Sequence, residues 1–251
     1  LAAQSFFHNI SAILGLVLSC IHKMSKITTL TFFSFKNSKF WAFKQMGIAN
    51  SSLAKIEGLQ FYKLLGTGGG AGFSLTPDFS TYAFLGVWEH LEYYENCLNT
   101  HPFFKEYKKR AQLQRNLVLE AVASHGKWSG TNPFKPEKQN TLNSAPLKAV
   151  VITRATLNWN RLFSFWRAVP AASRAIENAK GVLYYKGIGE LPFVQQATVS
   201  IWENFEAINT FAYKGKEHAK IVKMTKKRKW YKEDLFSRFY LLSDQTIRLN
   251  S

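Results

Sequence analysis

The chain has 251 residues, of which 15% are aromatic and two are cysteines, and its formal net charge is +17. Cys20 and Cys97 exclude a disulfide framework and a cluster of thiolate metal ligands, because both need cysteine pairs at short spacing. The length suits two domains of ordinary size, and the charge predicts an acidic partner such as anionic lipid or nucleic acid.

The first 23 residues differ in composition from the rest. Ile10–Ile21 is a run of apolar or small residues that is shorter than the roughly 20 residues needed to span a bilayer. It also lacks the basic start and the cleavage site of a secretory signal. Because Met24 stands directly before the first strand pattern, we expect residues 1–23 to be a non-native or disordered extension.

From Lys26 the pattern alternates between strands and helices. Residues 27–35 are β-branched and aromatic, and Ser38 stands as the N-cap of a stretch with apolar residues at helical spacing. Two strands, a helix and a strand follow. The order βαββαβ is therefore predicted for residues 24–129, with its later elements at 59–65, 81–87, 89–111 and 117–122.

After a linker at residues 130–146, rich in Pro, Asn and Lys, the same order returns in residues 147–251. The expected elements are strand 149–156, helix 162–179, strands 182–186 and 195–201, helix 205–226 and strand 235–242. The prediction is an α+β fold of tandem ferredoxin-like repeats with antiparallel sheets packed together. An apolar interior between such sheets suits a large hydrophobic ligand; alternatively, the aromatic side chains simply fill the core.

The two copies differ at one position that bears on chemistry. When Trp88 is placed over Trp202, His218 falls where the first copy has Phe104. A neutral imidazole on the long helix of such a unit is able to ligate an iron porphyrin from one side. The alternative is a histidine on a helix surface among lysines.

Other chemistry finds little support. The glycine-rich loop Gly66–Gly72 leads into a strand rather than a helix, which argues against a nucleotide cradle. No Gly-x-Ser-x-Gly or His-Glu-x-x-His motif occurs, so a hydrolase is not expected. Surface or capping roles are expected for the remaining histidines, which are His8, His22, His90, His101 and His125.

Several separate motifs in the same order resemble the spheroidene monooxygenase family of carotenoid biosynthesis. The resemblance covers nearly everything after Met24. The motifs are Phe40–Gly47, Phe61–Phe73, Gly126–Gly130, Ile152–Thr156, Phe165–Pro170, Lys186–Glu190 and Trp230–Ser243.

The resemblance implies a fold of the dimeric α/β-barrel type, a haem cofactor and O2-dependent oxidation at C2 of an acyclic or monocyclic carotenoid. The product is a 2-hydroxy or, after a second round, a 2-keto carotenoid. A redox cofactor is needed because a C–H bond of a polyene end group is inert to acid and base. An external electron donor, which we expect to be a reduced ferredoxin-like protein, completes the reaction.

Four residues are the candidates for the site. His218 is assigned as the haem iron ligand, since its helix position is similar to that of the proximal histidine in other haem-binding ferredoxin-like enzymes. Trp166 is expected to line the cofactor pocket. Arg154 and Arg167 are the catalytic candidates, placed to reach haem propionates or O2; the alternative for both is a surface arginine.

Residues 214–232 carry nine Lys or Arg against one Glu, with Trp230 and Tyr231 near the end. Such a run suits an anionic membrane surface, although a solvated helix face is the alternative. We therefore expect a cytoplasmic protein held peripherally at the inner face of the cytoplasmic membrane. No nucleic-acid-binding signature appears. A non-catalytic haem or lipophile carrier and a basic nucleic-acid-binding module remain as alternatives.

Overall fold

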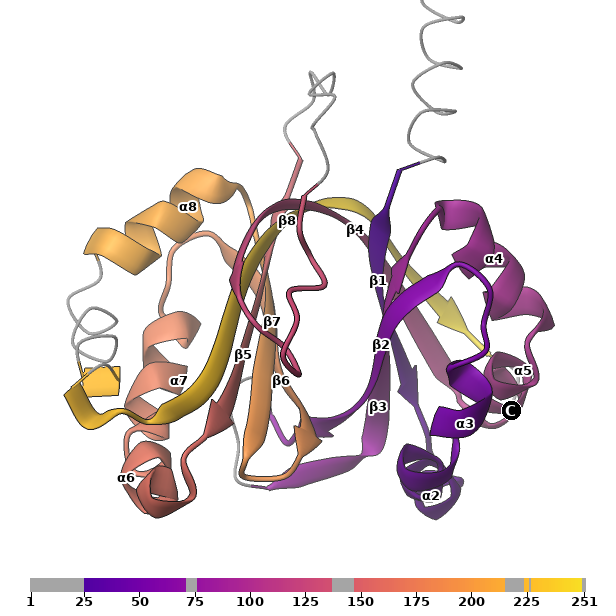
Figure 1. Ribbon diagram of the computed structural model, residues 1–251, viewed down its shortest axis with the longest axis horizontal. Coiled ribbons are helices and arrows are strands. Elements are labelled where there is room, and N and C mark those ends of the chain that lie inside the picture. The colour runs from indigo at the N-terminus through magenta and orange to yellow at the C-terminus, as the bar shows by residue number, and fades with distance from the viewer. Residues whose placement is uncertain (1–24, 71–75, 137–146, 215–223, 226, 250–251) are drawn as a thin grey trace, which may run out of the picture.

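The computed structural model describes residues 25–70, 76–136, 147–214, 224–225 and 227–249. Its strands form one closed barrel in the order β1-β3-β2-β6-β7-β5-β8-β4, as Figure 1 shows. All neighbouring strands are antiparallel. Closure gives every strand of the barrel two neighbours.

Each half of the chain contributes four strands. The first half contains β1 (Ile27–Ser34), α2 (Lys39–Ile48), α3 (Asn50–Leu53), β2 (Leu59–Gly68), β3 (Pro77–Trp88), α4 (Leu91–Thr100), α5 (Pro102–Arg110) and β4 (Leu113–Gly126). The second half contains β5 (Ala149–Leu157), η1 (Trp159–Arg161), α6 (Leu162–Trp166), α7 (Val169–Glu177), β6 (Val182–Leu191), β7 (Gln195–Trp202), α8 (Phe205–Asn209), η2 (Thr210–Lys214) and β8 (Tyr231–Arg248).

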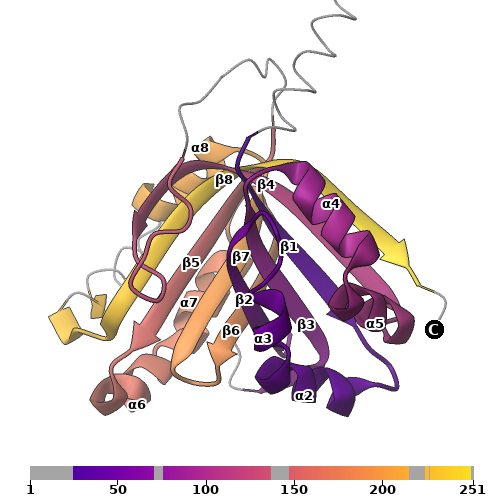
Figure 2. The same ribbon diagram turned by 45° about the vertical axis from the view of Figure 1, so that its right-hand side comes forward.

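Both halves have the ferredoxin-like arrangement, with the last strand beside the first and the third strand between the first and second. The predicted α+β class and tandem dimeric α/β-barrel arrangement are confirmed. The two sheets meet edge to edge along β4–β8 and along β2–β6, so that they enclose a common interior. Figures 1 and 2 show the helices on the outside of the barrel, with those of each half over its own strands.

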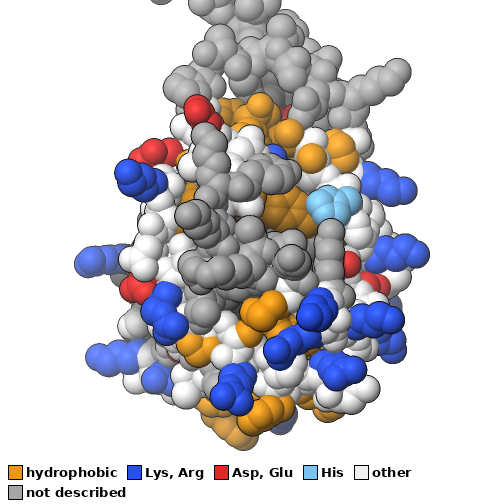
Figure 3. Space-filling view, turned by 90° about the vertical axis from the view of Figure 1, so that its left-hand side faces the viewer, with side chains coloured by type: hydrophobic (Ala, Val, Ile, Leu, Met, Phe, Trp, Pro, Cys, Tyr) orange, Lys and Arg blue, Asp and Glu red, His pale blue; other side chains and the backbone are white. Residues whose placement is uncertain are grey.

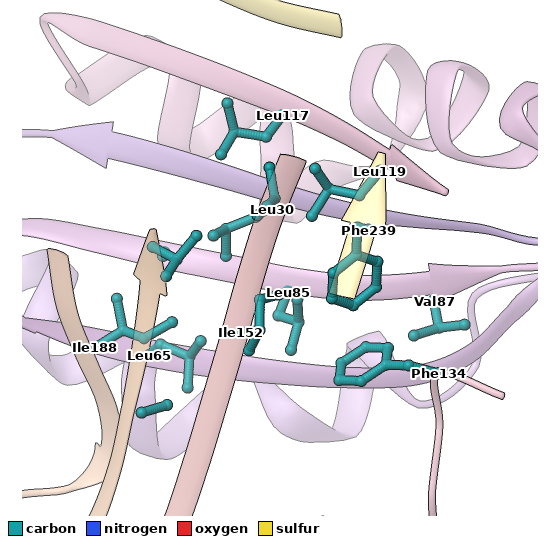
Figure 4. Packing of buried hydrophobic residues seen from close by; sticks show 14 of the residues in the cluster. Leu30, Leu65, Leu85, Val87, Leu117, Leu119, Phe134, Ile152, Ile188 and Phe239 are labelled. Atoms are coloured by element: carbon teal, nitrogen blue, oxygen red, sulfur yellow. The ribbon is translucent and has the colours of Figure 1, made fainter. Parts of the chain in front are cut away.

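The interior of the barrel is a packed hydrophobic core. Leu30, Leu85, Leu117, Ile152 and Phe239 are all fully buried there, and Figure 4 shows them pointing into one space from different strands. An eight-stranded barrel is just wide enough for side chains to fill it. The sequence left two expectations for the interior, a site for a large ligand or a core filled by side chains. The structure shows the second, so we look for a site of a large ligand outside the barrel.

Part of the expected linker belongs to this core. Phe134 is 1% exposed and its ring lies 5.2 Å from that of Phe239 and 6.2 Å from that of Trp128. Trp128 and Thr131 form a small antiparallel bridge that turns the chain back towards the barrel. The segment after β4 therefore covers one part of the interior.

The helices depart from their expected lengths where proline occurs. The helix expected at residues 89–111 is divided into α4 and α5, because Pro102 has no N–H to continue α4. His101 separates the two, and its Nδ1 accepts a hydrogen bond from the N–H of Phe103 at 3.3 Å, which confirms its capping role. The helix expected at 162–179 is likewise divided before Pro170 into α6 and α7.

Two further expectations differ in detail. Ser38 occupies the N-cap of α2, but its side chain makes no capping hydrogen bond. The last strand, expected at residues 235–242, extends over Tyr231–Arg248 because β8 pairs with β5 in the second half and then with β4 in the first. Of the helix expected at 205–226, the structure describes α8 and the π turn η2.

Candidate functional site

The strand registers allow the two halves to be compared position by position. Trp88 lies opposite Ile27 in the first half, and Trp202 lies opposite Ala149 in the second. Both indoles are buried and donate their Nε1–H to a hydroxyl on the same sheet. The superposition of Trp88 on Trp202, made from the sequence, is therefore the structural one, and Trp202 is a core residue.

In the first half, large side chains fill the space between the sheet and α5. Phe33 and Phe84 point outward from β1 and β3, and Phe104 of α5 packs between them with ring centroids 6.4 and 5.0 Å away. Leu64 of β2 joins the same cluster. All four are buried, so this outer face is an ordinary hydrophobic core.

The same positions in the second half carry small side chains. The registers pair β5 with β7 and β6 with β7 just as they pair β1 and β2 with β3. Phe33 is replaced by Ala155, Leu64 by Gly187 and Phe84 by Thr198. The sheet therefore lacks, at these three places, the bulk that meets Phe104 in the first half.

We call the patch made by Thr153, Ala155, Gly187 and Thr198 the second-half outer face. The residue that corresponds to Phe104 by its distance from the tryptophan is His218. His218 lies outside the described residues, together with the rest of residues 215–223. The part of the site that the structure describes is thus the second-half outer face, and the assignment of His218 to this site comes from the sequence.

A pair of hydroxyls marks the centre of the second-half outer face. Thr153 Oγ1 and Thr198 Oγ1 lie 2.6 Å apart, and both residues are half-buried. In the first half the equivalent of Thr153 is Thr31, whose hydroxyl instead bonds the Tyr94 hydroxyl of α4 at 2.9 Å. The second half thus presents two threonine hydroxyls where the first half has a bond between strand and helix.

The hydrophobic packing is also divided at this point. The first half has one outer cluster, whereas the described residues of the second half form two. One gathers Ala155, Phe165 and Trp230 beneath α6, and the other gathers Val151 and Trp202 beneath α8. The hydroxyl pair lies between these two clusters, because Thr153 stands between Val151 and Ala155 on β5.

Arg154 points the other way, into the barrel. Its side chain is 2% exposed and forms ion pairs with Glu233 of β8 and Glu190 of β6, and its guanidinium lies 5.7 Å from the centre of the Trp128 indole ring. Its Nε is buried and makes no hydrogen bond among the described residues. This placement favours a structural role for Arg154 over direct contact with a ligand on the outer face.

The carboxylates around Arg154 are themselves held in place. Glu190 accepts from the Trp128 indole N–H at 2.6 Å and pairs with Lys63 of β2 at 2.5 Å. Burial opposes ionisation of Glu233, but the backbone N–H groups of Gly130 and Ser129 and the charge of Arg154 outweigh it and hold its pKa below the ordinary range. Glu233 therefore stays charged at neutral pH.

Trp166 and Arg167 lie on the opposite side of β5 from Arg154. Trp166, at the end of α6, is half-buried against Phe165 and donates its indole N–H to the Phe193 carbonyl at 3.1 Å. Arg167, the next residue, is exposed. The structure thus brings Trp166 and Arg167 together beside the second-half outer face and separates both from Arg154 by the sheet.

The small residues of the face were not among the candidates predicted from sequence. In the sequence, placing Trp88 over Trp202 puts Phe84 over Thr198, and placing Gly58–Gly66 over Gly181–Gly189 puts Leu64 over Gly187. The sequence did not show that these side chains share one face of the sheet, which only the strand registers establish. Among the described residues, no group of three or more His, Cys, Asp or Glu is placed to hold a metal ion.

Known structures share this fold. A crystal structure of aldoxime dehydratase matches 90% of this chain and 86% of its own, with a TM-score of 0.55 and 10% identity. Aldoxime dehydratase OxdRE in complex with butyraldoxime matches 91% of this chain and 84% of its own, with a TM-score of 0.54 and 9% identity. At such identities the likeness concerns the fold alone.

Sequence relatives are much closer, although no family model matches the chain. Spheroidene monooxygenase of Cereibacter sphaeroides is 32% identical over 217 residues, which are 85% of this chain and 66% of that protein. Spheroidene monooxygenase of Rhodobacter capsulatus is 29% identical over 87% of this chain and 91% of that protein. The protein of the same name from Rubrivivax gelatinosus is 25% identical over 84% of this chain and 79% of that protein. With three such relatives aligned along most of its length, the chain belongs to the spheroidene monooxygenase family.

Proposed function

We propose that this chain is a haem-dependent monooxygenase that hydroxylates C2 of an acyclic or monocyclic carotenoid, the product being the 2-hydroxy carotenoid or, after a second round, the 2-keto carotenoid. Family membership supports the carotenoid substrate and the O2-dependent oxidation. The observation that carries the cofactor is the second-half outer face, where the large side chains of the first half are replaced by small ones.

The residues of this face fit a flat macrocycle. Ala155, Gly187 and Thr198 remove side-chain bulk from one continuous part of the sheet, since the three positions lie on neighbouring strands. His218 would hold the iron, as the sequence assigns it. The bound haem would supply O2 activation: two electrons and two protons reduce O2, one oxygen atom enters the C–H bond and the other leaves as water.

The chain's own residues would bind and orient the reactants. The hydroxyls of Thr153 and Thr198 are available to hydrogen-bond a polar group on this face. Trp166 supplies apolar surface at its edge, and the exposed guanidinium of Arg167 is placed to pair with a carboxylate such as a haem propionate. Arg154 would act indirectly, by fixing β5, β6 and β8 from inside the barrel.

The proposed substrate suits an enzyme that works at a membrane. A carotenoid is dissolved in the bilayer, so we propose that the protein works peripherally at the inner face of the cytoplasmic membrane and receives electrons from a reduced ferredoxin-like protein. Among the described residues, no helix is long and apolar enough to cross a membrane. The net charge of +17 is favourable both at an anionic surface and towards an acidic donor.

The first test is the absorption spectrum of the protein purified from a haem-sufficient host. We expect a Soret band in the parent protein that is lost in His218→Ala and kept in His125→Ala, whose exposed ring stacks on Phe236. Absence of the band from the parent would refute the haem assignment. If the Soret band is present but the protein does not oxidise a carotenoid when reductant and O2 are supplied, the result would instead support the non-catalytic carrier.

A further inference from the structure

One end of the barrel exposes an unusual number of large hydrophobic side chains. Among the residues that the structure describes, seven of the ten exposed large hydrophobic ones belong to it, from α2, the start of β3, η1, α6, the end of β6 and the turn that follows it. We call this surface the aromatic end; its members are Phe40, Phe43, Phe79, Trp159, Phe163, Leu191 and Phe193.

These segments come together because corresponding strand ends meet there. Ser34 at the end of β1 pairs with Thr81 near the start of β3. In the second half, the N–H of Leu157 at the end of β5 donates to the carbonyl of Val194 in the β6–β7 turn at 2.9 Å. Figures 1 and 2 both show α2 and α6 at this same lower end of the barrel.

The aromatic side chains stand clear of the core. Phe163 is 82% exposed, Phe40 is 80% exposed and Trp159 is 72% exposed. Single exposed apolar residues are common on protein surfaces, but a group of this size at one end marks a surface that binds an apolar partner. Trp is enriched at the interface of a bilayer, and Trp, Phe and Leu form the apolar face of helices that lie in this interface.

Basic residues surround the aromatic end. Segments 36–48, 77–80, 157–166, 191–194 and 227–230 contain seven Lys or Arg and one acidic residue, Asp78. Figure 3, which faces the second half, shows hydrophobic side chains at the lower end with Lys and Arg side chains gathered beside them. The basic residues, all exposed, are Lys36, Lys39, Lys44, Arg161, Lys227, Arg228 and Lys229.

We propose that the aromatic end docks on an anionic lipid bilayer, with Phe40, Trp159 and Phe163 entering the interfacial region and the basic residues facing the lipid phosphates. Apolar contact combined with positive charge is the requirement for peripheral binding to such a surface. A symmetric contact with a second copy fits less well, because it would bring the same basic residues of both copies together.

Docking in this way connects the surface with the candidate site. Helix α6 carries Phe163 at the aromatic end and, one turn later, Trp166 beside the second-half outer face. A polyene leaving the bilayer would therefore meet the candidate cofactor face directly. This last step rests on the proposed function, whereas the docking itself does not depend on haem or turnover.

The test is co-sedimentation of the full chain with vesicles of phosphatidylcholine alone or mixed in equal parts with phosphatidylglycerol. We expect binding to the mixed vesicles that is about tenfold weaker in the double variant Phe40→Ser, Phe163→Ser. The matched control is Leu183→Ser, which replaces an exposed apolar residue at the start of β6, away from the aromatic end, and we expect it to bind like the parent. Thermal unfolding of all three proteins checks that these surface changes leave the fold intact.

Three results would overturn the docking proposal: no binding of the parent to the mixed vesicles, equal binding by the parent and the double variant, or a dimer of the parent in solution that the double variant loses. The last would identify the aromatic end as a contact between copies. Turnover of detergent-dispersed carotenoid is measured separately. If the parent protein binds the mixed vesicles but shows no turnover, the proposed function would be refuted and the docking proposal would stand.

Discussion

At the scale of single residues, the exchange of Phe84 for Thr198 separates the two halves most clearly. Both side chains leave the third strand of their unit on its outer face. Phe84 is 1% exposed and packs against Phe104 at 5.0 Å, whereas Thr198 bonds Thr153 at 2.6 Å and stays half-buried. One position thus closes a core in the first half and presents a half-buried hydroxyl in the second.

Refilling that position should block the candidate cofactor site. In Thr198→Phe the ring would occupy the second-half outer face, and we expect the haem content of the purified protein to fall about tenfold, as overpacking of a formed site costs about 1–3 kcal/mol. The measurement is haem per protein from the pyridine haemochrome spectrum. Thr246→Phe, on the exposed part of β8 that pairs with β4 of the first half, is the control. Equal haem content in both variants would show that the cofactor binds elsewhere.

At the scale of elements, Arg154 joins three strands from within the barrel. It extends from β5 to Glu233 on β8 and Glu190 on β6, and Glu190 continues to Lys63 on β2. The equivalent position in the first half is Phe32, which lies in the hydrophobic core. A buried charge therefore replaces an apolar side chain, and it is balanced by two carboxylates.

Removing this guanidinium should destabilise the barrel without changing the cofactor. In Arg154→Met, Glu190 and Glu233 lose their common partner, and we expect the free energy of unfolding in urea to fall by about 3 kcal/mol. The Soret maximum of the folded variant should equal that of the parent. Arg174→Met, on α7, is the control for loss of one positive charge. A displaced Soret band in Arg154→Met at unchanged stability would restore the direct catalytic role inferred from the sequence.

At the scale of the whole molecule, the barrel closes along two seams of different length. Strands β4 and β8 pair from Leu113 to Gly126, whereas the described pairs between β2 and β6 are Gly66 with Gly189 and Thr67 with Ile188. Ion pairs supplement the short seam, with Lys63 bound to Glu190 and Lys186 lying 3.7 Å from Asp78. Closure along β2–β6 is therefore partly electrostatic.

This seam should respond to acid through Asp78. Burial opposes its ionisation, but hydrogen bonds from the Ser80 hydroxyl and N–H and the charge of Lys186 outweigh it and hold its pKa below the ordinary value of 3.8. A carboxyl group with a lowered pKa stabilises the fold above its unfolded pKa, and this contribution is lost as pH falls through the folded pKa. We expect the decline in unfolding free energy below about pH 4 to be shallower in Asp78→Asn than in the parent.

The measurement is urea unfolding at a series of pH values, followed by circular dichroism. Asp234→Asn, an exposed carboxylate on β8, is the matched control and should keep the parent's pH dependence. If Asp78→Asn and the parent lost stability in parallel as the pH fell, the ion pair with Lys186 would have no part in the closure of the barrel.

The sequence by itself determined the repeat and the order of the elements. Period-two patterns of β-branched and aromatic residues and helical spacing are local, so the βαββαβ order and the equivalence of Trp88 and Trp202 were predictable. The positions at which the elements end were harder to predict. The break at Pro102 follows from its missing N–H, whereas the full length of β8 depends on its two partner strands, β5 and β4.

Only the tertiary structure decided which face each residue occupies. Side chains alternate along a strand, so Arg154 and its neighbour Ala155 differ by one residue in the sequence and lie on opposite sides of the sheet. For the same reason the small residues of the second-half outer face, on three strands, form one patch only after register and closure are fixed. The aromatic end likewise gathers segments distant in the chain, because hydrogen bonding between strands, which is not local in sequence, brings their ends together.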